Sequence, residues 1–317
     1  MYLYQSSEFK DLIAQTADKL GLKPQIVEKD YWVCFILRKI VNSEFKDEFI
    51  FKGGTSLSKI WFNNFGRFSE DIDLLLKTNG AKRNALNTRL SELIKFINSL
   101  EGIEFDLENS TKLDADNKPI GCKFYFNYGM ENKEDLEGLK NQILLEPGYR
   151  GGIFPTTFKK MNSFVAENLI SIFKNEPEQI ADFQDILPFE VEVLNPERIL
   201  FEKIDAILAG CRKDSLKHST RHFYDIAQLI QLDCVKTLNN EQINTILDDI
   251  NRISKEFYGG KNLLSIETIK SSPVFQVDFA GLEELKTQYQ LEKHMYFGEA
   301  PDFEELYESI CGFIKNL

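Results

Sequence analysis

The sequence contains Phe51-Lys-Gly-Gly-Thr-Ser56 followed by Arg67-Phe-Ser-Glu-Asp-Ile-Asp-Leu74, and these two stretches indicate most about its fold. In the first stretch, a glycine pair leaves an apolar strand and precedes small hydroxyl residues. In the second, Asp71 and Asp73 stand two residues apart in an apolar run. Alternate residues of a strand share one face, so we expect both carboxylates on the same side of a sheet.

The glycine pair predicts a phosphate-binding turn. Backbone N–H groups can approach a phosphate closely where no Cβ is in the way. We therefore expect Gly53 and Gly54, with the hydroxyl of Thr55 or Ser56, to hold the β- and γ-phosphates of a nucleotide. The alternative is an ordinary strand-to-helix turn, which glycine also serves.

The two aspartates predict a metal site. Paired carboxylates repel each other unless a cation lies between them, and hard oxygen ligands suit Mg²⁺ or Mn²⁺. The apolar neighbours of Asp71 and Asp73 indicate a buried strand, which argues against the alternative of two solvated carboxylates. Ser69 lies on the same face and is expected to orient a phosphate or a carboxylate. Such a combination is typical of proteins that transfer nucleotidyl or phosphoryl groups.

The hydrophobic pattern predicts an α+β fold with a mixed sheet, N-terminal helices and a helical C-terminal part. Helices are expected over 8–45, 55–62 and 82–100 and from 196 onward, with a break at 259–260. Strands are expected at 48–52, 72–76, 103–109, 122–128, 142–147 and 189–194, and loops at 114–119 and 148–155. We place the domain boundary between 195 and 196, giving domains 1–195 and 196–317.

Composition limits the classes of protein to which the chain can belong. Its 317 residues suffice for two domains, and 43% are hydrophobic. The net charge of −12 argues against sequence-blind coating of nucleic acid but permits a local basic groove. Arg212–His222 concentrates positive charge, either as a solvated loop or as an electrostatic guide for phosphates. We expect a cytoplasmic protein with reduced thiols and no zinc site, because no long apolar run, signal peptide or paired Cys/His ligands are found.

Further motifs in the same order along the chain make it resemble a known family, the AbiEii/AbiGii-type nucleotidyltransferases, toxins of abortive-infection (phage-defence) type IV toxin–antitoxin systems. Besides the two stretches above, the matching pieces are Val27-Glu-Lys-Asp-Tyr-Trp-Val33, Ile143-Leu-Leu-Glu-Pro-Gly-Tyr-Arg150, Glu202-Lys203, Arg221-His-Phe-Tyr-Asp225, Met295-Tyr-Phe-Gly298 and Phe303-Glu-Glu-Leu306. The resemblance implies a polymerase-β-like nucleotidyltransferase core that binds an NTP and a divalent metal.

The resemblance also implies three further residues of the active centre. Glu146, at the end of an apolar strand, would be the third metal-binding carboxylate. The alternative is an ordinary surface glutamate at the end of a strand. Lys203 shares a helix face with apolar residues, so it needs a route to solvent or an anionic partner such as a triphosphate. Asp225 would join Lys203, although an ion pair with Arg221, four residues earlier, is a simpler explanation.

Two other residues have simpler readings. We expect His222 to be a structural histidine on a helix face. Arg198 and Glu202 are four residues apart and are expected to form an ion pair on the helix surface.

The expected reaction is metal-dependent transfer of an NMP unit from an NTP to an acceptor hydroxyl, with release of pyrophosphate. The resemblance points to RNA, above all the tRNA 3′ end, as the acceptor, and to a separately encoded antitoxin. Two alternatives remain: a protein-modifying nucleotidyltransferase that places AMP on Tyr, Ser or Thr, and a catalytically silent NTP-binding protein.

Overall fold

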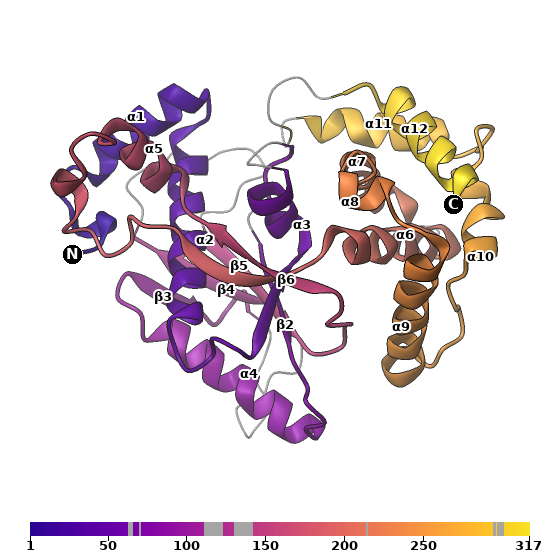
Figure 1. Ribbon diagram of the computed structural model, residues 1–317, viewed down its shortest axis with the longest axis horizontal. Helices are drawn as coiled ribbons and strands as arrows, with labels where there is room; N and C mark the ends of the chain where they lie inside the picture. Colours follow the sequence, from indigo (N-terminus) through magenta and orange to yellow (C-terminus); the bar gives the residue numbers. More distant parts are fainter. Residues whose placement is uncertain are drawn as a thin grey trace. The chain divides into compact units, whose positions relative to one another are not determined.

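The computed structural model describes residues 1–62, 66–69, 71–110, 123–129, 142–213, 215–293, 296 and 301–317 (Figure 1). It divides into two compact units that alternate along the chain. Unit 1 comprises Met1–Thr55, Glu70–Tyr149 and Phe158–Val193, and unit 2 comprises Ser56–Ser69, Arg150–Thr157 and Leu194–Leu317. The predicted loop at 114–119, Cys122 and all of Met295–Gly298 except Tyr296 lie outside the described residues.

A mixed sheet forms the centre of unit 1, as the sequence predicts. Within the described residues its strand order is β3-β4-β5-β2-β1-β7-β6. The strands are β1 (Phe49–Lys52), β2 (Ile72–Leu76), β3 (Ile103–Asp106), β4 (Phe124–Tyr128), β5 (Gln142–Gly148), β6 (Thr156–Met161) and β7 (Phe189–Leu194). β2 runs antiparallel to β1 and parallel to β5, and β1 runs parallel to β7.

The central strands are apolar because neighbouring elements cover them. Ile72, Leu74, Leu75 and Leu76 of β2 are all nearly inaccessible to solvent. A continuous apolar run of this kind is typical of a strand that is buried on both faces. On β5 the pattern alternates, with Ile143 and Leu145 buried and their neighbours partly exposed. The part-exposed face of β5 therefore carries Glu146.

Helices α2 (Pro24–Val41) and α4 (Arg83–Asn98) pack against strands of unit 1, and α1 (Phe9–Leu20) and α5 (Phe164–Ile172) pack against α2 (Figure 1). The single helical region predicted over 8–45 is two helices. Gly21 ends α1 in the left-handed conformation with φ of 66°, and Pro24 starts α2 at a favoured first position. The apolar face predicted for α4 is confirmed, with Leu86, Leu90, Leu93, Ile94 and Ile97 buried. Strand β6 and helix α5 are not predicted from the sequence.

The motif at residues 27–33 lies within buried α2. Asp30 accepts a hydrogen bond from the backbone N–H of Phe164 at 2.7 Å, which ties α2 to the first turn of α5. Trp32 is 1% exposed and packs edge-on against Phe35, with the ring centroids 5.4 Å apart. These contacts give the motif a structural role.

Unit 2 is helical, as predicted from residue 196 onward. Its helices are α6 (Pro196–Arg212), α7 (Thr220–Leu229), α8 (Asp233–Lys236), α9 (Asn240–Tyr258), α10 (Ile266–Lys270), α11 (Leu282–Leu291) and α12 (Phe303–Asn316). Gly259, in the left-handed conformation, ends α9 at the predicted break. Helix α7 packs against α6 and α12, and Phe223, Phe303 and Tyr307 form an aromatic core between α7 and α12. Among the described residues, no helix combines the length and apolarity needed to cross a membrane.

Candidate active site

The turn after β1 is shaped by Gly53. Its φ is +79°, and a Cβ built there would overlap the carboxylate oxygen Oδ2 of Asp73. Glycine is therefore needed both for the backbone conformation and for space. Helix α3 (Gly53–Ser56), which includes Gly54, starts here. Thr55 is 1% exposed, and its hydroxyl donates to the backbone carbonyl of Asp71 at 2.6 Å, which fastens this turn to the start of β2.

Strand register places the predicted acidic residues side by side in unit 1. Asp73 is the register partner of Glu146 across the parallel β2–β5 ladder, and of Lys52 across the β1–β2 ladder. Register partners point to the same face of a sheet. Asp71 lies directly before β2, which begins at Ile72. Asp73 and Glu146 are thus neighbours beside the Gly53 turn.

Lys123, directly before β4, faces these acidic residues. Its Nζ lies 3.3 Å from Oε1 of Glu146, and the charge of Glu146, with a smaller contribution from Asp71, raises the pKa of Lys123. The side chain of Lys123 is 60% exposed and that of Glu146 27% exposed, so solvent weakens this pair. Lys123 was not predicted as a site residue, because only the pairing of β4 with β5 brings it to Glu146.

The strand register suits a divalent metal at this face, but the side chains do not form a complete set of ligands. The β2–β5 register aligns Asp73 with Glu146, and carboxylate oxygens are ligands that Mg²⁺ prefers. Among the described residues, however, no three His, Cys, Asp or Glu side chains are gathered closely enough to hold a metal ion. The ammonium of Lys123 instead pairs with Glu146. A metal bound by Glu146 would compete with Lys123 for this carboxylate.

In unit 2, Asp225 on α7 is held between two cations. Arg67 binds it with two hydrogen bonds, Nε to Oδ1 at 3.0 Å and Nη2 to Oδ2 at 2.9 Å. Nζ of Lys203 on α6 lies 2.8 Å from the same Oδ2. Burial alone would raise the pKa of Asp225, but the charges of Arg67 and Lys203 outweigh burial and hold this pKa well below its usual range.

Two simple ion-pair readings of the sequence need correction. The pairing of Asp225 with Arg221 is wrong, because Nε of Arg221 lies 3.7 Å from Oε2 of Glu292 instead. Arg198 does bind Glu202, at 3.0 Å, but its side chain is only 1% exposed and not on the surface. It also donates to Asp249 at 2.6 Å and to the carbonyl of Phe154 at 3.2 Å.

His222 lies beside the Asp225 cluster as a neutral imidazole. Burial first, and then the positive charge of Lys203, lower the pKa of His222 to about 3. Its Nδ1 is buried and has no hydrogen-bond partner among the described residues. These facts support the structural reading of His222.

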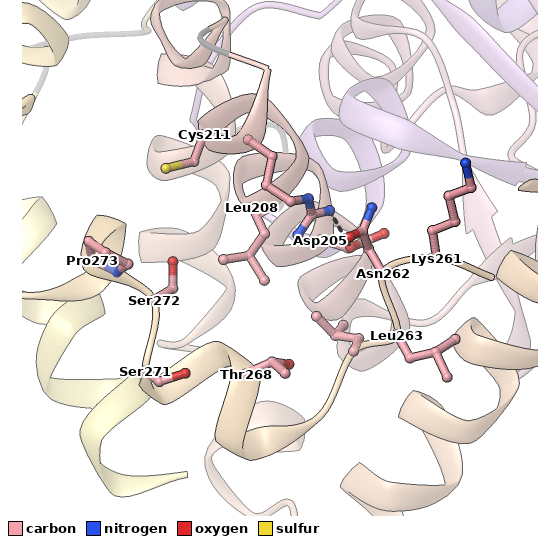
Figure 2. A pocket seen from close by; sticks show the side chains of 12 residues that line it. Asp205, Leu208, Cys211, Lys261, Asn262, Leu263, Thr268, Ser271, Ser272 and Pro273 are labelled. Atoms are coloured by element: carbon pink, nitrogen blue, oxygen red, sulfur yellow. Dashed lines mark ion pairs between the residues drawn. The ribbon is translucent and has the colours of Figure 1, made fainter. Parts of the chain in front are cut away.

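A cavity of about 500 Å³ in unit 2 opens elsewhere on α6 (Figure 2). Asp205, Leu208 and Arg212 line it from one helix face, whereas Lys203 lies on the face that carries Ile199 and Ile207. Arg212, the first residue of the basic segment, lies 3.9 Å from Asp205 here. This cavity is therefore separate from the Lys203–Asp225 cluster.

The predicted site residues are divided between the two units. Gly53, Gly54, Thr55, Asp71, Asp73 and Glu146 belong to unit 1, and Ser56, Ser69, Lys203 and Asp225 belong to unit 2. Within each unit the structure brings key members together: Gly53, Asp73 and Glu146 in the first, Lys203 and Asp225 in the second. Their union in one active centre stays a prediction. Arg67 was not predicted as a site residue, although a buried aspartate needs a cationic or hydrogen-bonding partner.

Comparison with known proteins agrees with the resemblance found in the sequence. Residues 35–309 match the family model "Nucleotidyl transferase AbiEii toxin, Type IV TA system". The fold is similar to that of MenT4, a nucleotidyltransferase toxin from Mycobacterium tuberculosis H37Rv, with a TM-score of 0.57 and 14% identity over 97% of this chain and 90% of that one. JHP933 from Helicobacter pylori gives a TM-score of 0.47 and 15% identity over 93% and 92% of the two chains. A search of curated protein sequences finds no match. Since the family model covers most of its length, the chain belongs to the AbiEii family of nucleotidyltransferase toxins of type IV toxin–antitoxin systems.

Proposed function

We propose that this toxin uses a divalent metal to transfer an NMP unit from an NTP to a hydroxyl of RNA, with the tRNA 3′ end as the first candidate. It acts in the cytoplasm and is countered by a separately encoded antitoxin. The observation that carries the proposal is the β2–β5 register, which sets Asp73 beside Glu146 at the Gly53 turn. Family membership supplies the reaction class.

Asp71, Asp73 and Glu146 are the proposed metal ligands, for Mg²⁺ or Mn²⁺. A bound metal neutralises charge on the transferring phosphate and lowers the pKa of the attacking hydroxyl. Residues of the turn after β1 would keep these carboxylates in position. Gly53 keeps the space over the turn open to the Asp73 carboxylate, and the Thr55 hydroxyl holds the turn against the start of β2.

We propose that the remaining site residues bind the phosphates of the NTP. The backbone N–H groups at Gly53 and Gly54 and the hydroxyls of Ser56 and Ser69 are suitable donors to phosphate oxygens. Lys203 contributes positive charge for the triphosphate, with Asp225 holding its ammonium at 2.8 Å. Arg67, Lys203 and Asp225 together carry a formal charge of about +1, which suits an anionic ligand.

RNA is favoured as the acceptor by the local charge of unit 2. Arg212–His222 is rich in cations although the whole chain has a net charge of −12. The side chain of Arg221 is 48% exposed, so it is accessible to a phosphate backbone. The net charge itself suits a protein acceptor equally well, which keeps protein modification as the second candidate.

The experiment supplies each of the four α-labelled NTPs in turn, with Mg²⁺ and a lysate that contains total RNA and protein. We expect one NTP to label a species that nuclease destroys and protease does not. Label that protease removes instead would establish the protein-modifying alternative. Tight NTP binding without label on any acceptor would establish the silent NTP-binding alternative.

A further inference from the structure

Arg67 lies in the segment Ser56–Ser69, which belongs to unit 2 although unit 1 residues flank it on both sides in the sequence. We propose that Arg67 is a positioning residue for the reaction: it supplies the counter-charge of Asp225 and thereby leaves the positive charge of Lys203 available to the NTP. This inference rests on the proposed function, because it assumes that Lys203 serves the triphosphate.

The geometry of the pair is that of a bidentate clamp. Nε and Nη2 of Arg67 reach the two different carboxylate oxygens of Asp225, at 3.0 and 2.9 Å. The side chains of Arg67 and Asp225 are only 9% and 2% exposed. A planar guanidinium bound in this way fixes the plane of the carboxylate, so Oδ2 is held toward Nζ of Lys203.

The surroundings of Arg67 hold its own side chain in place. Nη1 donates to the carbonyl of Phe68 at 3.3 Å, and the backbone of Arg67 forms a β-bridge with Tyr296. The ring of Tyr296 packs on Tyr224, with the centroids 4.5 Å apart, and Tyr224 directly precedes Asp225 on α7. Tyr296 therefore contacts both the segment that carries Arg67 and the helix that carries Asp225.

Formal charges show what the clamp does for Lys203. With Arg67 present, two cations share one carboxylate, and the three side chains carry about one net positive charge. Without Arg67, Asp225 and Lys203 neutralise each other in a buried ion pair. A lysine that is fully compensated in this way attracts a triphosphate much less. Arg67 thus acts on the substrate through Asp225 and Lys203.

The test compares the steady-state kinetics of R67Q and R67K with those of the wild type, using the NTP and acceptor that the labelling experiment identifies. R67Q removes the charge, so we expect the KM for the NTP to rise about 10-fold or more. R67K restores the positive charge but not the bidentate hydrogen bonds to Asp225. We expect its KM to return to within about 3-fold of wild type while kcat stays about 10-fold low. R252Q removes a 57%-exposed arginine of unit 2 and is the matched control.

Thermal unfolding of each variant separates positioning from folding. If R67Q does not fold, the expected split between KM and kcat in R67K decides the test. Wild-type KM and kcat in R67Q, together with an inactive K203M, would overturn the clamp and leave the proposed function intact. Activity lost only in proportion to the unfolded fraction would also overturn it. Full activity in K203M would instead remove Lys203 from the proposed function.

Discussion

Gly53 has no room for a side chain, because an added Cβ would meet the carboxylate of Asp73. We predict that G53A lowers activity about 100-fold or more, since it displaces the Asp73 carboxylate. The backbone strain costs roughly 1–3 kcal/mol of stability. The measurements are transfer rate and thermal unfolding. G80A is the matched control, because Gly80 has a φ of +77° and no atom within 4 Å of an added Cβ. Equal activity loss in G80A would refute the role of Gly53.

His222 makes the folded protein sensitive to acid. Its pKa is about 3 when folded and about 6.5 when unfolded, so the unfolded state binds more protons between these values. The stabilisation is complete above pH 6.5 and is lost as pH falls toward 3, by at most about 1.4 kcal/mol per pH unit. We predict that H222Q has a flatter dependence of the free energy of unfolding on pH between 6.5 and 4.5. Denaturant titrations at several pH values measure it, and equal slopes would contradict the prediction.

Side-chain partners were harder to predict from the sequence than residue types. Asp71 and Asp73 could be selected because carboxylates next to an apolar strand are costly and need a reason, whereas Glu146 was selected through the family resemblance. The partner of Asp225 could not be predicted, because Arg67 is distant in sequence and Arg221 lies at the right helical spacing. Lys123 was missed for the same reason, since only strand pairing brings it to Glu146.

At the scale of elements, the β2–β5 ladder places Glu146 beside Asp73. We predict that E146Q lowers transfer about 100-fold or more, because a neutral amide is a poor metal ligand. Stability should change by at most about 1 kcal/mol, since the partner Lys123 is mostly exposed.

The control is K123M, which releases Glu146 from its ion pair and should retain activity at a Mg²⁺ concentration no higher than the wild type needs. Titrating Mg²⁺ or Mn²⁺ against transfer rate measures both variants. Unchanged transfer by E146Q over the whole metal titration would exclude Glu146 as a ligand.

Elements with strong periodicity were predicted and weakly patterned ones were not. Strand β2 and helix α4 were predicted within a residue or two, because long apolar patterns define them. Strand β6 was missed because Met161 is its single buried residue, so it shows no buried alternation. Helix α5 is short, and its clearest signal was Ser163, whose side chain caps the first turn.

At the scale of the whole molecule, each compact unit is built from three separate segments of the chain. The sequence suggests one boundary between 195 and 196, which stays a prediction. Residues 56–69 and 150–157 precede that boundary yet belong to unit 2. Hydrophobic periodicity could not reveal this, because it describes local structure and not which distant segments pack together.

The central claim is that Asp71 and Asp73 bind the metal for nucleotidyl transfer. The most direct measurement is transfer of labelled NMP to total RNA by the double variant D71N/D73N. D18N/D47N, which neutralises two exposed aspartates of unit 1, is the matched control. We predict full labelling by the wild type and the control and none by D71N/D73N, with all three equally folded. Undiminished labelling by D71N/D73N would contradict the claim.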